Sequence, residues 1–228
     1  MTAEPTVFET MYSLRAMRRL KPDRVPEDLI WKVLETATKA PSGGDSQPWR
    51  FVVVQDPGTK AFIQERYKKA WDLYLQANLE EISRRDPSPK AEEMDRRVRM
   101  GRAATHLAEH LHEVPVLILV CMTPRDPDQV RTQYGDLRSR AALYASIFPA
   151  VENMLLACRA LGLGATLTTL HLLYEPEIKA RLGIPDDVET VALLPIGYPM
   201  GRFGPTTRLP VGEVTYWDRW GQHRASDA

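Results

Sequence analysis

The sequence predicts a fold of the α/β or α+β class. Four apolar runs have the length and composition of buried strands, at residues 50–56, 114–122, 165–170 and 188–199. About six segments with helical periodicity lie between and around them. A long charged helical segment at about 59–112 separates the first two strands, and this irregular order argues against simple βαβ repeats.

The N-terminal part is expected to hold a weak helix, a well-defined helix and a strand. Residues 6–17 have weak helical periodicity, whereas residues 25–40 place Pro26 in a first turn and apolar side chains at helical spacing. The run at 50–56 is expected to be a buried strand that ends at an Asp-Pro-Gly turn.

The charged segment at about 59–112 is expected to form two helices. They meet at an exposed tip, the Asp-Pro-Ser-Pro sequence at 86–89. Two aromatic residues on the first helix, Trp71 and Tyr74, either cap a substrate channel or pack the helix on the body, and the sequence leaves both alternatives open.

The C-terminal part alternates between strands and helices. First come a buried strand at 114–122, a loop at 131–140 and a helix at about 138–161 that ends in a glycine cap at 161–164. A short strand at 165–170, a helix at 175–183 and a buried strand at 188–199 are expected next. The tail at 201–221 is expected to wrap the surface. The long helix is expected to turn Ala142, Ala145, Ile147, Val151, Met154, Leu155 and Cys158 inward.

The composition is that of a globular protein that needs no disulfide or metal to fold. The chain has 228 residues, 43% hydrophobic and 26% charged, and thirty basic residues balance thirty acidic ones. Net charge therefore favours no nucleic-acid partner. The cysteines, Cys121 and Cys158, lie in apolar runs, which is typical of buried thiols in a reducing compartment. With no apolar core of the signal-peptide kind and no run long enough for a membrane span, we expect a cytoplasmic protein without a membrane partner.

Familiar catalytic motifs are missing. The loop APSGGDSQPW at 40–49 has no Gly-Lys-Ser/Thr and enters a strand, so it is not a P-loop. The Gly-Leu-Gly at 162–164 follows a helix and lacks a third glycine, which favours a helix cap over a dinucleotide fingerprint. His106 and His110 are four apart, but Leu107 stands where a zinc motif has glutamate, so we expect no metal site.

A basic cluster remains, with Arg15, Arg18 and Arg19 ahead of a proline turn. On a helix, spacing of three would put Arg15 and Arg18 on one face. The cluster is either a solvated helix end or an anion clamp, since paired arginines bind phosphate well.

Four segments taken together resemble the nitroreductase family of FMN-dependent oxidoreductases. Residues 15–30 resemble its Arg-Ser-x-Arg-x-Phe motif, residues 40–54 its Ala-Pro-Ser-x-x-Asn-x-Gln-Pro-Trp loop and following strand, residues 146–170 its central helix, glycine cap and strand, and residues 193–221 its Gly-Tyr-Pro segment and C-terminal arm. The segments occur in family order.

The resemblance implies a fold of the α+β class, a three-layer α-β-α sandwich with a mixed, largely antiparallel sheet. It implies a single domain over residues 1–228, with a helical insert at about 59–112 and a C-terminal arm at about 200–228. It also implies an intertwined homodimer, with an FMN at each of two sites in the dimer interface.

Site residues carried over from the resemblance fall into three groups. Arg15 would bind the FMN phosphate or ribityl chain, with Ala16 and Met17 beside it, and Arg18 would lie beside flavin N1 and O2. Pro41, Ser42, Gly43, Asp45 and Gln47 would come from the partner chain's loop, the first four of them lining the ring. Leu167, Thr168 and Thr169 would face the ring near N5, and Arg208 would pair with the phosphate.

The implied activity is ping-pong hydride transfer from NADH or NADPH through FMN N5 to nitroaromatic or quinone-like acceptors. FMN carries the chemistry, so no catalytic side chain is expected, and Arg18 would stabilise the charge of the reduced ring. The alternatives are other flavin chemistry on the same fold, namely dehalogenation, ene reduction or flavin cleavage, or flavin binding without catalysis.

The sequence departs from the family pattern in several places. Ala16 replaces the motif serine and Leu20 its phenylalanine. Asp45 replaces the asparagine of the loop, and an ionised carboxylate there would oppose negative charge on the reduced flavin. Thr206 and Thr207 stand where relatives often carry basic residues.

Overall fold

Four antiparallel strands form the centre of the protein. The structure is a computed structural model that describes residues 5–84, 91–123 and 143–224. The strands are β1 (Trp49–Val54), β2 (Val116–Met122), β3 (Gly164–Ala165) and β4 (Glu189–Gly197), in the sheet order β1-β2-β4-β3. Each pair among them is antiparallel, so the described sheet contains none of the parallel pairing that a mixed sheet would have.

The side chains of β2 point alternately to the two faces of the sheet, which explains why the sheet has a core on both faces. All seven residues of this central strand are buried, and successive side chains of a strand point to opposite faces. One core contains Val116, Ile118, Val120 and Met122 from this strand, and the other contains Leu117, Leu119 and Cys121. The three-layer architecture follows because each face needs a helical cover.

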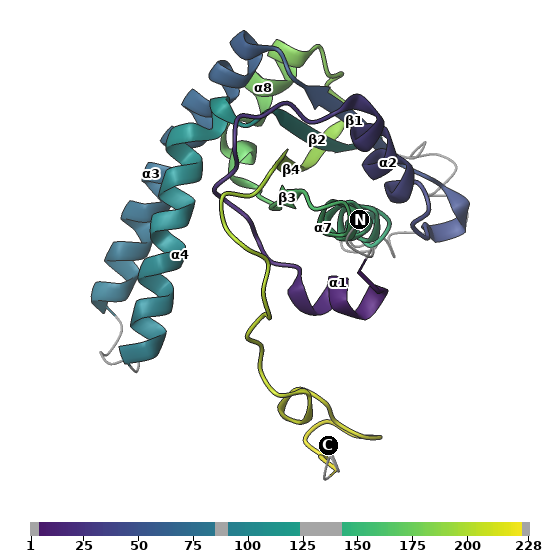
Figure 1. Cartoon of the computed structure of the whole chain (residues 1–228), viewed down its shortest axis with the longest axis vertical. Coiled ribbons are helices and arrows are strands. Elements are labelled where there is room, and N and C mark those ends of the chain that lie inside the picture. The colour runs from purple at the N-terminus through teal and green to yellow at the C-terminus, as the bar shows by residue number, and fades with distance from the viewer. Residues whose placement is uncertain (1–4, 85–90, 124–142, 225–228) are drawn as a thin grey trace.

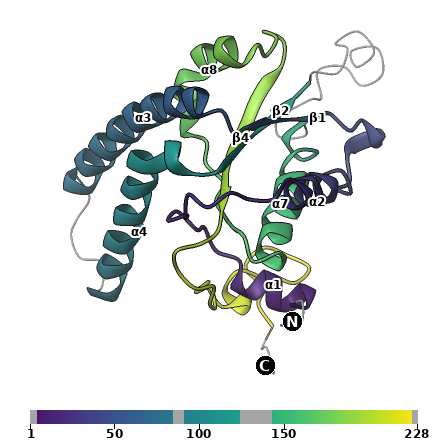
Figure 2. The ribbon, with the colours of Figure 1, turned by 45° about the horizontal axis from the view of Figure 1, so that its top comes forward.

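The helices supply those two covers (Figures 1 and 2). They are α1 (Val7–Ser13), α2 (Glu27–Ala37), α3 (Pro57–Arg84), α4 (Ala91–His110), α7 (Phe148–Ala160) and α8 (Glu175–Leu182), with short 3-10 turns η1 (Gly43–Asp45), η2 (Leu111–Glu113), η3 (Leu170–Tyr174) and η4 (Val211–Glu213). Buried residues of α2 and α7 join the first core, and those of α3, α4 and α8 join the second. In both views α3 and α4 run side by side and project from the body.

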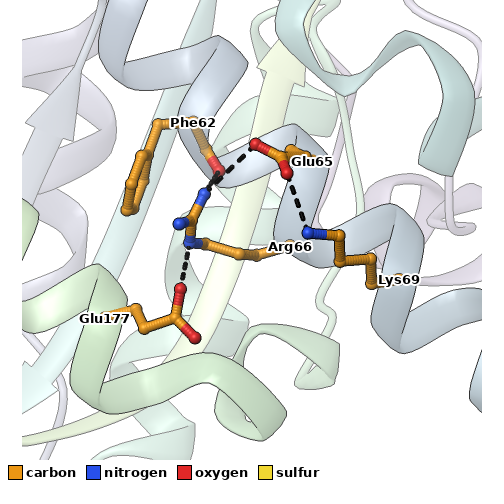
Figure 3. Close-up of polar contacts among 5 residues, drawn as sticks. All are labelled: Phe62, Glu65, Arg66, Lys69 and Glu177. Carbon is orange, nitrogen blue, oxygen red and sulfur yellow. Dashed lines mark hydrogen bonds and ion pairs between the residues drawn. The ribbon is translucent and has the colours of Figure 1, made fainter.

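The projecting helical pair is held at its base by an ion-pair network (Figure 3). Arg66 on α3 donates through Nε to Glu177 of α8 at 2.6 Å, and its guanidinium lies 3.4 Å from the centre of the Phe62 ring. On the same helix Glu65 accepts from Lys69 at 2.8 Å. The side chain of Arg66 is only 16% exposed, so this contact docks α3 on α8.

Most of the expected elements are confirmed. Helix α2 lies within the helix expected at 25–40, and α8 with its left-handed Gly183 matches the one expected at 175–183. The charged segment forms two helices, whereas its expected tip at 86–89 and the loop at 131–140 lie outside the described residues.

Four expectations are corrected. Strand β1 is an edge strand, with Val53 exposed, rather than fully buried. The helix expected over 138–161 is interrupted: residues 143–144 are helical, a turn with exposed Ala145 follows, and α7 begins at Phe148, while residues 138–142 lie outside the described chain. The strand expected at 165–170 shrinks to Gly164–Ala165 plus one bridge at Thr168, because η3 begins at Leu170. The C-terminal tail extends away from the sheet past α1 instead of wrapping its own chain (Figure 1).

Candidate functional site

The basic cluster lies on an extended segment beside the sheet, not on a helix. Helix α1 ends at Ser13, so the helix face expected for Arg15 and Arg18 does not form. The segment is held instead by main-chain hydrogen bonds: Met17 N–H donates to Ala165 at 2.9 Å and Lys21 N–H to Tyr198 at 2.8 Å. The β3 edge of the sheet therefore fixes the position of both arginines.

Two glycines allow the segment to approach the sheet this closely. A Cβ on Gly164 would lie 2.8 Å from Leu20 Cδ2 and 2.9 Å from Met17 Cβ. A Cβ on Gly197 would lie 3.0 Å from Pro115 and 3.3 Å from the Lys21 carbonyl oxygen. Neither glycine has a positive φ, so each is needed for space rather than for conformation. Met17 and Leu20 are buried at these points. The side chains of Arg15, before them, and Arg18, between them, remain at least partly exposed.

Among the described residues, no carboxylate neutralises the guanidinium groups of Arg15 and Arg18. Arg15 is exposed and Arg18 is half-buried. Within residues 5–84, 91–123 and 143–224, neither forms an ion pair. The arm passes nearby, because Thr206 N–H donates to the Tyr12 carbonyl at 3.1 Å, and it carries Arg208. Unpaired guanidinium groups in a fixed position are suited to an anionic group such as a phosphate.

The expected N5-facing residues lie beside this cluster. Leu167 and Thr168 are half-buried and Thr169 is exposed. Thr168 exchanges both main-chain hydrogen bonds with Leu193 of β4, at 3.0 and 2.9 Å. Its hydroxyl lies 2.9 Å from the hydroxyl of Tyr67 on α3. Burial raises the pKa of Tyr67, opposed by the hydrogen bond to Thr168 and by the positive charge of Arg18.

The glycine-rich loop stands elsewhere in the same chain. It enters β1 at Trp49, which pairs with Met122, and Met122 pairs with Glu189 at the start of β4. Strand β3 instead pairs with the far end of β4, at Gly197. The loop therefore lies at the opposite edge of the sheet from both Arg18 and Thr168, and one chain does not bring the predicted set together. Arg18 is also toward the other end of the strands, whereas Thr168 pairs with Leu193 in the middle of β4.

Inside the loop, the Asp45 carboxylate accepts a hydrogen bond from a residue of the same loop. Gln47 donates from its side-chain amide to Asp45 Oδ1 at 2.9 Å, and its main-chain N–H donates to Ser42 Oγ at 3.1 Å. Both Asp45 and Gln47 have positive φ, of 49° and 45°. Asn and Asp tolerate this region better than most residues, so Asp45 can replace the asparagine of the family pattern without changing the backbone.

Other candidate chemistries find little support among the described residues. Burial raises the pKa of Cys121 to about 11 and that of Cys158 to about 12, which keeps both thiols protonated. His106 and His110 stack at 4.3 Å, and in the described part of the chain no three His, Cys, Asp or Glu side chains gather where they could hold a metal ion. No described helix is long and apolar enough to cross a bilayer.

Comparison with known proteins decides the family. The profile of the nitroreductase family matches residues 13–198, which includes the basic segment, the loop, and the β3 and β4 strands. The chain belongs to the nitroreductase family. This confirms the resemblance seen in the four motifs.

Individual relatives of this nitroreductase-family chain differ in their activities. It is 32% identical over 209 residues to NADH dehydrogenase from Thermus thermophilus, covering 89% of this chain and 91% of the relative. It is 30% identical over 203 residues to human iodotyrosine deiodinase 1, covering 84% of this chain but 61% of that protein's length. A crystal structure of iodotyrosine deiodinase bound to FMN and 3-iodo-L-tyrosine superposes with a TM-score of 0.67 at 24% identity, covering 90% of this chain and 96% of that one. The family and these relatives support flavin-dependent oxidoreductases as the general class.

Sequence reasoning missed two parts of this nitroreductase-family site. Tyr67 carries no local signal, because its role depends on where α3 docks. Gly164 was expected to help cap a helix, whereas Gly162, with φ of +76°, is the residue in the left-handed conformation. The second glycine of the pair could have been recognised from the adjoining strand, where a small residue permits close backbone approach.

Proposed function

We propose that this protein is an FMN-dependent oxidoreductase that uses NADH or NADPH to reduce nitroaromatic or quinone-like acceptors. The observation that carries the proposal is the segment with Arg15 and Arg18, neither of which forms an ion pair among the described residues, held at the β3 edge of the sheet in a chain of the nitroreductase family. The charge of Arg18 acts on Tyr67, whose hydroxyl contacts that of Thr168. When bound, FMN would accept hydride from the nicotinamide and pass electrons to the acceptor.

The residues at the sheet edge fit the chemical groups of FMN. Arg15 would bind the phosphate or ribityl chain, aided by Arg208 from the arm. Arg18 would place its charge against N1 and O2, where negative charge gathers on reduction. Leu167, Thr168 and Thr169 would lie near N5.

A second copy of the chain would complete the site. Within one chain, the loop at residues 41–47 and Arg18 lie at opposite edges of the sheet, so the loop would line the ring of the FMN held by the partner. Apolar side chains on the arm also lack cover: Leu209 is 68% exposed, Val211 70% and Trp220 88%. Exposed apolar surface of this kind is typical of an interface, and an intertwined homodimer would bury it.

The direct test is whether the purified protein is yellow and whether its flavin is reduced. We expect bound FMN that loses its visible absorption anaerobically with NADH or NADPH and regains it on addition of a nitroarene or quinone. Light scattering should give the mass of two chains. A protein that remains colourless after incubation with FMN would contradict the proposal, and FMN that neither nicotinamide reduces would favour non-catalytic flavin binding.

Reductive dehalogenation is the second candidate, favoured by the similarity to iodotyrosine deiodinases. The chain spans about three fifths of the human deiodinase's length, so the activity of that whole protein is a proposal for this one. Chemically reduced protein should release iodide from 3-iodotyrosine faster than it reduces nitroarenes if this candidate is right. Faster turnover of the nitroarene would support the first.

A further inference from the structure

A pair of hydroxyl groups joins the helical insert to the candidate flavin site. Tyr67 lies on α3 and Thr168 lies just after β3, and their oxygen atoms are 2.9 Å apart. Tyr67 is 4% exposed. The positive charge of Arg18 acts on Tyr67, so the guanidinium proposed for the flavin and the two hydroxyls share one neighbourhood.

Both ends of this hydrogen bond are held in place. The main chain of Thr168 is paired in both directions with Leu193. On the other side, Tyr67 shares a buried face of α3 with Ile63 and Ala70, and the neighbouring Arg66 docks that helix on α8 (Figure 3). The contact is therefore between two rigid elements, and little freedom remains except in the hydroxyl protons.

The hydrogen bonds among the described residues favour donation by the Tyr67 hydroxyl. If Thr168 donated to Tyr67, the proton of Tyr67 would have no acceptor among the described residues, and an unsatisfied buried donor is costly. If Tyr67 donates, its proton is satisfied. The oxygen of Thr168 then accepts from Tyr67, and it also accepts from the Leu170 N–H at 3.5 Å. The proton of Thr168 is left to point away from both, because one hydroxyl has one donor and two acceptor positions.

We infer that Tyr67 is a positioning residue, whose hydroxyl donates to Thr168 and so aims the Thr168 hydroxyl at the ring of the bound flavin. The inference rests on the proposed function, since it needs FMN beside Thr168. It gives the helical insert a second role: α3 would set the orientation of a site hydroxyl through one hydrogen bond, in addition to any covering of the substrate.

The test compares Tyr67→Phe, Thr168→Val and the double variant with Thr105→Val. Thr105 is a matched control, because its hydroxyl accepts from Trp71 at 3.2 Å within the same insert and does not touch Thr168. For each protein, FMN dissociation, the visible spectrum and midpoint potential of bound FMN, and its anaerobic reduction rate by NADH are measured. A role in folding alone would change stability and leave the spectrum and potential as in the wild type.

We expect Tyr67→Phe to shift the spectrum and potential and to slow reduction about two- to tenfold, the effect of one net hydrogen bond. Thr168→Val should do the same, and the double variant should be no worse than either single one. Thr105→Val should match the wild type. In a Thr168→Ser background, which keeps the hydroxyl, Tyr67→Phe should retain its effect.

Two results overturn the inference in distinguishable ways. If the wild type binds and reduces FMN but Tyr67→Phe matches it in spectrum, potential and rate, only the positioning role fails. If the effects of Tyr67→Phe and Thr168→Val add up in the double variant, the positioning role fails as well, because the two hydroxyls then act independently. If the wild type binds no FMN, the proposed function fails and the inference fails with it. Should Tyr67→Phe not fold, the Thr168→Val and Thr168→Ser pair decides, since equal spectra in those two would exclude an oriented hydroxyl.

Discussion

The two halves of the candidate site are built in different ways. The basic segment and Thr168 are attached to the β3 edge of their own sheet by main-chain hydrogen bonds and by the close approach at Gly164. In the loop at residues 41–47, Gln47 bonds to Ser42 and Asp45 close by in the sequence, and Gly43 N–H donates to Ser146 Oγ at 3.0 Å. The first half is part of the fold, whereas the second is presented outward from the opposite edge.

This difference assigns different tasks to the two halves. Rigid groups can hold charge in a fixed place, which is what electrostatic stabilisation requires. A loop with several exposed residues can instead lie against a surface supplied by another molecule. Changes in the first half should therefore affect both the fold and the redox chemistry, and changes in the second should affect the bound ring while leaving the fold intact.

The largest expected effect is that of removing Arg18. Arg18→Ala should slow reduction of bound FMN about 100-fold, the effect typical of losing one preorganised donor, and weaken FMN binding much less. Arg208→Ala should do the reverse and weaken FMN binding about tenfold, as for a charged hydrogen bond. Stopped-flow reduction and fluorescence titration measure the two quantities. Equal effects on both quantities in both variants would show that the roles are assigned wrongly.

A smaller effect is expected from filling the space at Gly164. Gly164→Ala should destabilise the protein by about 1–3 kcal/mol, as overpacking does, and weaken FMN binding because the segment bearing Arg18 is displaced. Gly101→Ala is the matched control: it lies on α4 with open space around it, and should stabilise by about 0.5–1 kcal/mol. Urea unfolding with FMN titration checks both. Unchanged FMN affinity in Gly164→Ala would show that the close approach at Gly164 does not set the position of Arg18 for FMN binding.

The smallest effect is expected in the loop. Asp45→Asn keeps an acceptor for Gln47 and a residue that tolerates positive φ, so unfolding free energy should change by less than about 0.5 kcal/mol. Removing the charge should raise the flavin midpoint potential by about 20 mV, equal to about 1 kcal/mol for a two-electron couple. Asp187→Asn, a change at another exposed carboxylate, controls for net charge. An identical potential in the two variants would place Asp45 away from the ring.

Sequence reasoning could recover the elements whose pattern is local. The helix at Glu27–Ala37 has apolar side chains at helical spacing, β2 is a continuous apolar run, and β4 is apolar from Val191 onward, so each is fixed by its own residues. The motif at Arg15–Arg18 and the loop at 40–49 were recognisable as family signatures and needed no three-dimensional information.

The remaining features depend on contacts between distant segments. Arg15 to Arg18 are extended because Met17 and Leu20 pack against Gly164, which outweighs a weak helical preference. Strand β1 is apolar yet lies at an edge, since an apolar run does not reveal its neighbours. Tyr67 meets Thr168 across about a hundred residues of sequence, a separation over which no pattern in the chain carries a signal.

The ion pair between Arg66 and Glu177 fixes α3 on α8, and Ala70 and Trp71 are still buried one turn further along the helix. From Trp71 the helix runs to Arg84, about 20 Å at 1.5 Å per residue, and residues 72–77 are exposed. The hydroxyl of Tyr67 therefore belongs to the packed part of α3. Any covering of an acceptor would fall to the part of the helix that extends beyond the core.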